Sequence, residues 1–552
     1  MQRVRNFLIY FALFAGAVIF AWPFIWMAAT SVKLEKEMYG EKIHLWPASP
    51  APEAMSPYVD TRYYRDVNGP RMKEAVTDIE ADLQKMSYAW PPDLDRAELV
   101  HTCATGIYKK MRDSQPPAIW QQPADQLEET LRGQVTIALA DDVVEHVRRT
   151  FCVGELSIRS YDLQDQKLVD GSDSAAGWQQ GVSGQAQLVQ QTGSKPYAEV
   201  HYDLTQSDWF ALTRTFSTDF PINRLYRIQL SVKDDDSWNR LTVYLEKQGH
   251  LYKAEHVHAM GDTLPNICFW QEPGPDDQVT NKIHNWISLR QIASGPQYES
   301  DPHKLRIRIE VRHANLIDAW AEKIWHNYQI TLNYVPFWRY VATSVFIVIL
   351  SLIGTLFSCS LVAYSFARLQ WPGRNFCFML MLATMMIPGQ VTMIPYFLIV
   401  RSLGWYNTLY PLWIGNFFAA AFNVFLLRQF LQGVPRDLED AARIDGCGFW
   451  RIYWHIMLPL VRPTLAVIGI FTFMGAWNDF MGPLIYLSDE RLYPLSLGLY
   501  ALSVSTHGVS SGAGTFGVVM AGSLLMTLPV IAIFFFAQRY FLKGVALTGM
   551  KG

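Results

Sequence analysis

The chain has 552 residues, more than one ordinary domain, and half of them are hydrophobic. The formal net charge is −3, so there is no basic surplus of the kind that indicates nucleic-acid binding. The six cysteines are scattered without a CxxC pair, which indicates neither a metal site nor a redox framework.

Residues 1–32 are predicted to form a cytoplasmic tail and a first transmembrane helix. The run Phe7 to Met27 carries no charge over 21 residues, about the length that crosses the hydrocarbon core. A cleaved signal peptide is the alternative. This run is longer than a typical signal core and ends in bulky aromatic residues, so we expect a retained span.

Residues 33–335 are predicted to form a large inserted domain, because they hold most of the charge and no spanning run. Its helical part covers about 57–150, with helices expected near Arg71–Met86 and Asp95–Met111. From about 151 to 318, alternating apolar residues predict many short strands, separated by turn clusters such as KDDDS and EPGPDD. Such a pattern favours a β-sandwich-like fold.

Several residues in this insert are candidate ligand-binding groups. Five aromatic residues offer ring faces on which a sugar could stack, although a place in the core is more common for any one of them: Trp209, Phe210, Trp238, Trp270 and Trp286. Three histidines lack a cysteine or acidic partner at ligand spacing, so they indicate a metal only weakly: His250, His256 and His258. Cys103, Cys152 and Cys268 allow one disulfide in an oxidising compartment, and the pairing stays open.

Residues 336–552 return to apolar runs and are predicted to contain five further transmembrane helices. The expected spans are Val341–Ala367, Phe376–Val400, Leu409–Leu427, Pro463–Trp477 with its extension FMGPLIYL, and Phe516–Ala537. The predicted fold class is therefore an α-helical polytopic membrane protein with six spans and an inserted, mostly β-sandwich α+β domain.

Lys and Arg counts orient these spans. With the N-terminus in the cytoplasm, the cytoplasmic loops and tails hold twelve basic residues, including Arg3, Arg5, Arg368 and Arg443. The short outer loops hold only Arg401 and Arg491. The bias predicts that both termini are cytoplasmic and that the insert 33–335 is extracytoplasmic.

The loop 435–460 lies between spans four and five and is too polar to cross a membrane. An acidic helix is expected to run into Gly446, since glycine tolerates the positive φ of a helix end. A second short helix is expected to stop at Leu458–Pro459. Its four aromatic residues are spaced to share one side of that helix: Phe449, Trp450, Tyr453 and Trp454. A docking element and an interfacial amphipathic helix both fit these residues equally well.

The spacing in this loop resembles the cytoplasmic coupling loop of ABC importer permeases, summarised as EAA, three residues, G, nine residues, I, one residue, LP. The matching residues are Asp440-Ala441-Ala442, Gly446, Ile456 and Leu458-Pro459. Asp440 stands where the family usually has Glu. It stays open whether Asp440 makes the usual contact or whether Glu439 takes it over.

Other runs resemble the G-type subunit of maltose-type permeases, in the carbohydrate-uptake group. They include PFIWMAATSVK, AYSFARLQWPGRN, MMIPGQVTMIPYFLIVRSLGWYNTLYPL, FTFMGAWNDFMGPLIYL and QRYFLKGVALTGMKG, within about 1–50 and 330–552. G-type subunits usually have a short first outer loop, so the insert of about 300 residues is the main departure.

The resemblance implies a transmembrane subunit of an ATP-driven sugar or oligosaccharide importer in a bacterial inner membrane. Its implied partners are two copies of an ATPase subunit that binds ATP and Mg, a second, F-type permease subunit, and an extracytoplasmic solute-binding protein. The implied ATPase-coupling residues are Glu439, Asp440, Ala441, Ala442, Gly446, Phe449, Trp450, Ile456, Leu458 and Pro459. The chain has no GxxxxGK[ST] phosphate loop, so we expect no cofactor and no enzymatic activity of its own.

Four residues near the spans are candidates for a translocation path. Asn478 and Asp479 are polar groups in or near the end of the fifth span, where an ionisable group is a functional candidate. The alternative, slightly favoured, is an interfacial Asp satisfied by backbone groups near Pro483. Pro388 and Pro395 predict a kinked or broken third span, which could line a path or only shape packing.

Two other function classes fit the sequence less well. A secondary transporter would show inverted repeats and mid-membrane ionisable groups, and neither is clear in this sequence. The hypothesis of a membrane-anchored carbohydrate-binding protein does not explain the five further spans or the cytoplasmic loop.

Overall fold

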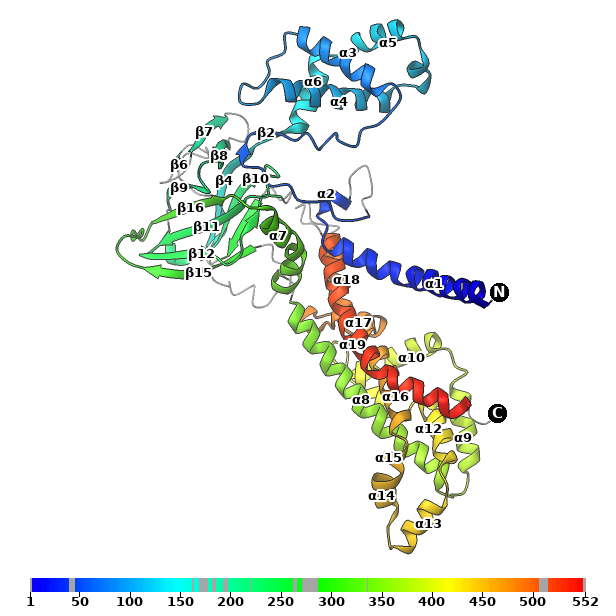
Figure 1. Cartoon of the computed structure of the whole chain (residues 1–552). Coiled ribbons are helices and arrows are strands. Elements are labelled where there is room, and N and C mark those ends of the chain that lie inside the picture. The colour runs from blue at the N-terminus through cyan, green and yellow to red at the C-terminus, as the bar shows by residue number, and fades with distance from the viewer. Residues whose placement is uncertain are drawn as a thin grey trace.

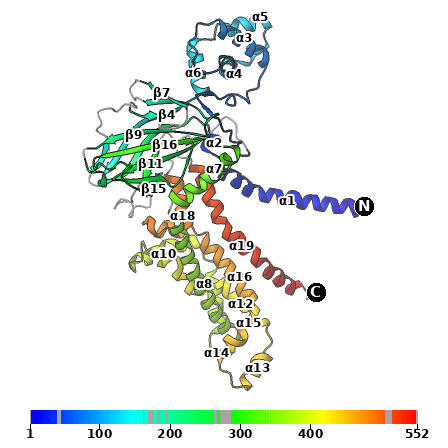
Figure 2. The ribbon, with the colours of Figure 1, turned by 60° about the vertical axis from the view of Figure 1, so that its left-hand side comes forward.

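The computed structural model shows three parts along one elongated molecule: a bundle of apolar helices, a strand domain and a small helical domain (Figures 1 and 2). The structure describes residues 2–38, 45–160, 163–167, 177–180, 185–191, 197–218, 220–261, 266–270, 286–334, 336–505 and 515–549.

The first apolar helix, α1 (Gln2–Ser31), extends away from the rest of the molecule (Figure 1). No residue in its membrane-length window is buried against the rest of the described chain. Its C-terminal end packs beside the start of α19 (Thr515–Gly549), and its last residues, Thr30 and Ser31, are buried there. The outer surface of α1 is therefore available to lipid or to another chain.

The central helix of the bundle is α8 (Phe337–Arg368), and α12 (Ala421–Gly433) and α16 (Arg462–Trp477) pack along it. The other helices are α9 (Arg374–Thr384), α10 (Gly389–Ser402), α11 (Tyr410–Trp413), α13 (Asp437–Ile444), α14 (Phe449–Ile452), α15 (Leu458–Leu460), α17 (Met481–Tyr486) and α18 (Leu495–Ser505).

Among the described residues, four helical segments are long and apolar enough to cross a membrane: Val4–Ser31, Phe337–Arg368, Tyr410–Gly433 and Phe516–Phe536. Two bent pairs bring the number to six if each counts as one span. The pair α9 and α10 bends by 98°, and Phe449–Leu460 with α16 bends by 77°. Pro388 stands at the first bend, directly before α10, whereas Pro395 lies inside α10. The break in the third span that the prolines predict is therefore present.

The small helical domain contains α3 (Met72–Lys85) and α4 (Arg96–Ser114), where the sequence predicts helices. It also contains α5 (Ala124–Arg132) and α6 (Ile137–Val147), which the sequence analysis missed. The carboxylate of Asp95 caps α4 by accepting the backbone N–H of Ala97 at 2.8 Å. The centre of α4 is fully buried, and with neighbouring helices it forms the core of this domain.

The strand domain has two layers. The first contains β1 (Met55–Ser56), β4 (Phe151–Ser160), β5 (Leu163–Lys167), β7 (Gln185–Gln191), β8 (Tyr197–Asp203), β10 (Leu225–Lys233) and β14 (Asn266–Trp270). The second contains β6 (Gln179–Gln180), β9 (Trp209–Ser217), β11 (Arg240–Lys247), β12 (His250–Ala254), β13 (His258–Ala259), β15 (Trp286–Ser294) and β16 (Lys304–Arg312). The parallel pair β14–β15 joins the layers, and the other described pairs are antiparallel. A separate pair, β2 (Tyr58–Val59) with β3 (Arg148–Arg149), lies beside the helical domain.

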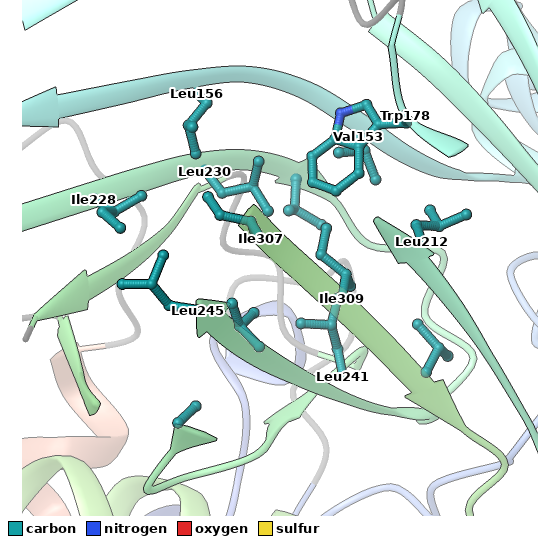
Figure 3. Close-up of a cluster of buried hydrophobic side chains, with 14 of the residues drawn as sticks. Val153, Leu156, Trp178, Leu212, Ile228, Leu230, Leu241, Leu245, Ile307 and Ile309 are labelled. Carbon is teal, nitrogen blue, oxygen red and sulfur yellow. The ribbon is translucent and has the colours of Figure 1, made fainter. Parts of the chain in front are cut away.

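The two layers share one core (Figure 3). Ile228 and Leu230 of the first layer lie opposite Leu245, Ile307 and Ile309 of the second, and all five are at most 2% exposed. Alternation along each strand explains this, because successive side chains point to opposite faces.

The structure locates several of the aromatic and histidine residues that are candidate ligand-binding groups in this domain. Phe210 and Trp238 are 1% and 6% exposed, so they are core residues, whereas Trp209 is half-buried. The side chains of Trp270 and Trp286 lie outside the described residues. His258 contacts Asp234 at 2.8 Å, and no group of described His, Cys, Asp and Glu residues could hold a metal ion.

The structure describes the side chains of two of the three cysteines in the insert. Cys103 and Cys152 are both free and buried, the first inside the helical domain and the second in β4. The side chain of Cys268, in β14, lies outside the described residues. A bond between Cys103 and Cys152 is therefore absent.

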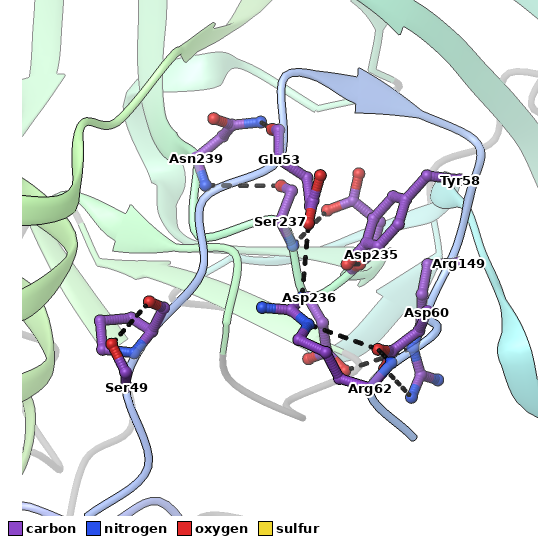
Figure 4. A network of polar contacts seen from close by, with 11 residues as sticks. Ser49, Glu53, Tyr58, Asp60, Arg62, Arg149, Asp235, Asp236, Ser237 and Asn239 are labelled. Atoms are coloured by element: carbon purple, nitrogen blue, oxygen red, sulfur yellow. Dashed lines mark hydrogen bonds and ion pairs between the residues drawn. The ribbon is translucent and has the colours of Figure 1, made fainter. Parts of the chain in front are cut away.

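A polar network ties the segment 49–62 to the loop that follows β10 (Figure 4). The hydroxyl of Tyr58 donates to the carbonyl of Asp235 at 2.7 Å, and the side-chain amide of Asn239 donates to the carbonyl of Glu53 at 2.9 Å. Arg149 bridges Asp60 at 3.3 Å and Asp236 at 3.6 Å. Burial raises the pKa of the Asp235 carboxyl. The helical domain is thus fastened to the strand domain through several buried polar groups.

The two ends of the insert meet at one joint beside the bundle. Lys323 of α7 (Leu316–Gln329) donates to the carboxylate of Glu37 in α2 (Glu35–Met38), and the two side chains are 1% and 8% exposed. The amide of Asn327 donates to the carbonyls of Ser31 and Lys33, each at 2.9 Å. Thr331 donates to the carbonyl of Val518 in α19 at 3.2 Å. The joint therefore connects α1, the insert and the last long helix.

Candidate functional site

The loop 435–460 lies at one end of the helical bundle (Figure 1). Helix α13 ends where the sequence predicts, because Gly446 adopts φ +79°. The backbone N–H of Gly446 donates to Arg443 and that of Cys447 to Ala442, a Schellman ending. A Cβ on Gly446 would meet nothing within 4 Å, so its positive φ, and not crowding, favours glycine here.

Glu439 faces the interior of the bundle. Its carboxylate lies 3.2 Å from Nε of Arg368, the last residue of α8, and the two side chains are 6% and 3% exposed. The contact is an ion pair without a well-aligned hydrogen bond. The guanidinium of Arg368 also donates to the carbonyls of Leu431 and Val434, at the end of α12. Arg368 thus ties α13 and α12 to the end of α8.

The residues beside Glu439 face outward. Asp440 and Ala441 are exposed, and Ile444 is 87% exposed. Ala442 is buried with Glu439 on the inner side of α13. The motif residues therefore divide between two faces of one short helix.

The aromatic residues after Gly446 divide in the same way. Phe449, Trp450 and Trp454 are 57%, 66% and 48% exposed. Tyr453 is buried instead, and its hydroxyl lies 2.7 Å from the hydroxyl of Ser360 in α8. The expectation that all four aromatic residues share one side is therefore wrong for Tyr453. A π-helical turn at Tyr453–Met457 changes the angular spacing and turns this side chain inward.

A second difference concerns where the helix after Gly446 ends. The helix does not stop at Leu458–Pro459, because α15 continues to Leu460 and the bend falls before α16. Pro459 occupies the first turn of α15, where a missing N–H is tolerated. Ile456 and Leu458 are half-buried against the core of the bundle.

The candidate path residues lie elsewhere. Asn478 ends α16, is exposed, and donates to the carbonyl of Met474 at 2.9 Å. The carboxylate of Asp479 accepts the backbone N–H of Gly482 at 3.1 Å, next to Pro483. Both residues, and the break at Pro388, lie away from α13 and α14 in the bundle (Figure 1). The structure does not bring the two predicted sets together.

No motif in the sequence marks Arg368 or Ser360, which contact the inner side of the loop through Glu439 and Tyr453. The available signal was a single arginine at the end of a long apolar run, followed by LQWPG.

Comparison with known proteins identifies the family. The profile of the binding-protein-dependent transport system inner membrane component matches residues 359–547. The arabinooligosaccharides transport system permease protein AraQ of Halalkalibacterium halodurans is 37% identical over 216 residues, which cover 39% of this chain and 75% of the relative. The chain belongs to this family of ABC importer permeases.

Further relatives of the permease come from other bacteria. The diacetylchitobiose uptake system permease protein NgcG of Streptomyces coelicolor is 31% identical, with 46% of this chain and 78% of the relative covered. The polygalacturonan/rhamnogalacturonan transport system permease protein YtcP of Bacillus subtilis is 32% identical, with 39% and 77% covered.

Among solved structures, the permease is similar to a chain of a bacterial ABC transporter involved in the import of the acidic polysaccharide alginate. That chain is 26% identical, and the match covers 39% of the permease and 79% of that chain with a TM-score of 0.36.

Proposed function

We propose that this permease imports a sugar or oligosaccharide and that its loop 435–460 couples ATP hydrolysis by a separate subunit to translocation. The two-sided loop carries the proposal. Its inner side is fixed to α8 through the buried pair Arg368–Glu439, and its outer side leaves Asp440, Phe449 and Trp450 exposed. A partner that moves the outer side would therefore move the end of α8 as well.

Asp440 is the carboxylate proposed to contact the ATPase, since Glu439 is engaged inside the bundle. A shorter side chain than Glu still allows a charge-assisted hydrogen bond to a basic partner residue. The exposed aromatic rings would fill a cleft in that partner, as large rings commonly do at interfaces.

The proposed arrangement has six spans, of which the bent pair α9 and α10 forms the third and α16 with α17 forms the fifth. Lys and Arg bias places both termini and the loop 435–460 in the cytoplasm. The insert, with its sandwich-like strand domain, then lies outside the bacterial inner membrane.

The proposed complex contains two ATPase copies that bind ATP and Mg, an F-type permease chain and an extracytoplasmic solute-binding protein. The exposed surface of α1 and the break at Pro388 suit contacts with lipid or the second permease. The carbohydrate substrate is supported by the relatives, whose names specify arabinooligosaccharides and diacetylchitobiose.

Replacing Gly446 with valine tests the coupling role. A β-branched residue at φ +79° costs about 1–3 kcal/mol and distorts the end of α13. We expect the Gly446→Val chain to insert and assemble, but to lose most substrate-stimulated ATP hydrolysis and uptake in proteoliposomes.

Gly448 offers a matched control in the same loop. Its φ of −75° and ψ of 168° suit a β-branched residue, and a Cβ there also meets nothing within 4 Å. We expect Gly448→Val to keep coupled uptake. Wild-type uptake in Gly446→Val would contradict the proposal, and uptake that needs no ATPase partner would indicate a secondary transporter.

A further inference from the structure

The second strand layer turns a basic face away from the core. Apolar core residues alternate along β16 and β11, so the intervening side chains, which are mostly polar, point to the other face of the layer. The strand register places seven basic residues of the second layer on this face: Arg240, Lys253, Arg290, Lys304, Arg306, Arg308 and Arg312.

Four of these seven cations have carboxylate partners. The pairs are Arg240–Glu322 at 3.0 Å, Lys304–Asp301 at 3.5 Å, Arg306–Glu246 at 3.0 Å and Arg312–Glu310 at 2.7 Å. Within the described part of the chain, Arg308, Lys253 and Arg290 have no ion pair. The unmatched positive charge is therefore concentrated at three residues.

These three residues occupy one straight row across the layer. In the strand register, Arg308 lies opposite Tyr244, Tyr244 opposite Lys253, and Lys253 opposite Arg290. Thr213 of β9 extends the row beyond Arg308. Strands lie about 4.8 Å apart, so the row from Arg308 to Arg290 is about 14 Å long at the backbone.

The row is electrostatically unbalanced. Lys253 and Arg290 are like charges directly opposite each other, an arrangement that destabilises a sheet. The guanidinium of Arg308 lies 4.3 Å from the ring centroid of Tyr244, and the ammonium of Lys253 lies 5.8 Å from it. The ring attracts both cations without neutralising them. Nε of Arg308 is buried and has no hydrogen-bond partner.

We propose that this row binds a linear acidic oligosaccharide, with uronate carboxylates at Arg308, Lys253 and Arg290. The hexose units of such a chain repeat at a length comparable with the strand spacing, so successive carboxylates can follow successive strands. Guanidinium and ammonium groups donate charge-assisted hydrogen bonds to carboxylates. The hydroxyls of Thr213 and Tyr244 are suited to the neutral hydroxyls of the sugar.

The narrowness of the row favours a saccharide over an acidic protein. The neighbouring cations Arg306 and Arg312, on either side of Arg308 along β16, are already neutralised by glutamates. A protein partner would need complementarity over a far wider patch, about 800 Å² on each side. The inference rests on the proposed function, because it assigns an acidic carbohydrate to a carbohydrate importer.

The test uses the full-length permease in lipid nanodiscs, with fluorescently labelled trigalacturonate as the probe and galactotriose as its neutral counterpart. We expect the double variant Lys253→Gln/Arg290→Gln to weaken trigalacturonate binding at least about tenfold, since two charged contacts are lost. Both side chains are exposed and their like charges repel, so the melting temperature should not fall.

Arg312→Gln is the matched control, because it removes a cation from the same face that Glu310 already neutralises. We expect it to retain wild-type affinity for trigalacturonate. Equal weakening in both variants, equal affinity for galactotriose, or no trigalacturonate binding would overturn the proposal. So would a double variant that binds trigalacturonate normally but no longer binds an acidic solute-binding protein.

The outcome can be separated from that of the coupling proposal. Gly446→Val should still bind trigalacturonate, because the strand domain lies beyond the end of the bundle that is opposite α13 and α14 (Figure 1). If acidic sugar fails to bind while uptake stays coupled to ATP hydrolysis, this inference alone is wrong.

Discussion

Glu439 and Asp440 are neighbours in the chain but have different environments. One step along a helix turns a side chain by about a quarter turn or more, so Glu439 meets Arg368 while Asp440 points outward. Removing one partner of a buried ion pair costs about 3–5 kcal/mol, whereas an exposed carboxylate contributes little to stability. The two carboxylates should therefore respond differently to neutralisation.

We expect Glu439→Gln to lower the melting temperature of the purified permease and Asp440→Asn to leave it unchanged. Asp440→Asn should instead reduce ATP hydrolysis in the assembled complex. The double variant Arg368→Met/Glu439→Met should recover part of the lost stability, since the buried ion pair is removed whole while the carbonyls of Leu431 and Val434 lose their donor. Equal melting shifts in the two single variants would contradict this division of roles.

The buried thiols of the insert give a second prediction at this scale. Burial raises the pKa of Cys103 and of Cys152 to about 12. At pH 8 about one thiol in ten thousand is then ionised, and the thiolate is the reactive form. Iodoacetamide should label both residues in guanidinium but neither in the native permease, as followed by peptide mass spectrometry. Rapid labelling of the native protein would show that these cores open easily.

Local spacing was enough to recognise the motif of the proposed coupling residues but not the orientation of their side chains. The run from Asp440 to Pro459 is recognisable because all of its residues lie in one short segment. The partner of Glu439 lies on α8, far away in the chain, and only packing brings it close. The side chain of Tyr453 could not be placed either, because local spacing predicts neither the π-helical turn nor the contact with Ser360 of α8.

At the scale of elements, hydropathy and turn residues predicted the long helices and the break at Pro388. The third candidate span is a bent pair, as its prolines predict, whereas the bend beside the fifth candidate span falls before α16, at the end of the loop 435–460. Strand pairing was not predictable. The alternation of apolar and polar residues in β14 and β15 is similar to that of many other strands in the domain, so the sequence does not indicate that these two strands pair. The amphipathic helix α7 was also missed, although it holds the joint together.

Lys323 should be essential to that joint. We expect Lys323→Met to leave Glu37 buried without its cation and to loosen the contact of the insert with α1 and α19. Hydrogen–deuterium exchange should then rise at Ser31–Glu37 and in α7. Glu322→Gln is the control, because its partner Arg240 is about one-third exposed and the pair contributes little. Similar exchange in both variants would show that Lys323 does not hold the joint.

At the scale of the whole molecule, the division into apolar runs and one polar insert was visible in the sequence. The shape was not, because it depends on how the helical domain, the strand domain and the bundle are fastened together. Among the described residues these fastenings include the polar network around Asp235, the contacts of Lys323, Asn327 and Thr331, and the apolar cluster of Leu34, Trp238 and Ala319.

The joint has one further consequence. The chain leaves the membrane bundle at Lys33 and returns at Thr331, and these two points are held together by Asn327. The insert therefore begins and ends at neighbouring points, and a short connection between α1 and α8 could bridge the gap that its removal would leave.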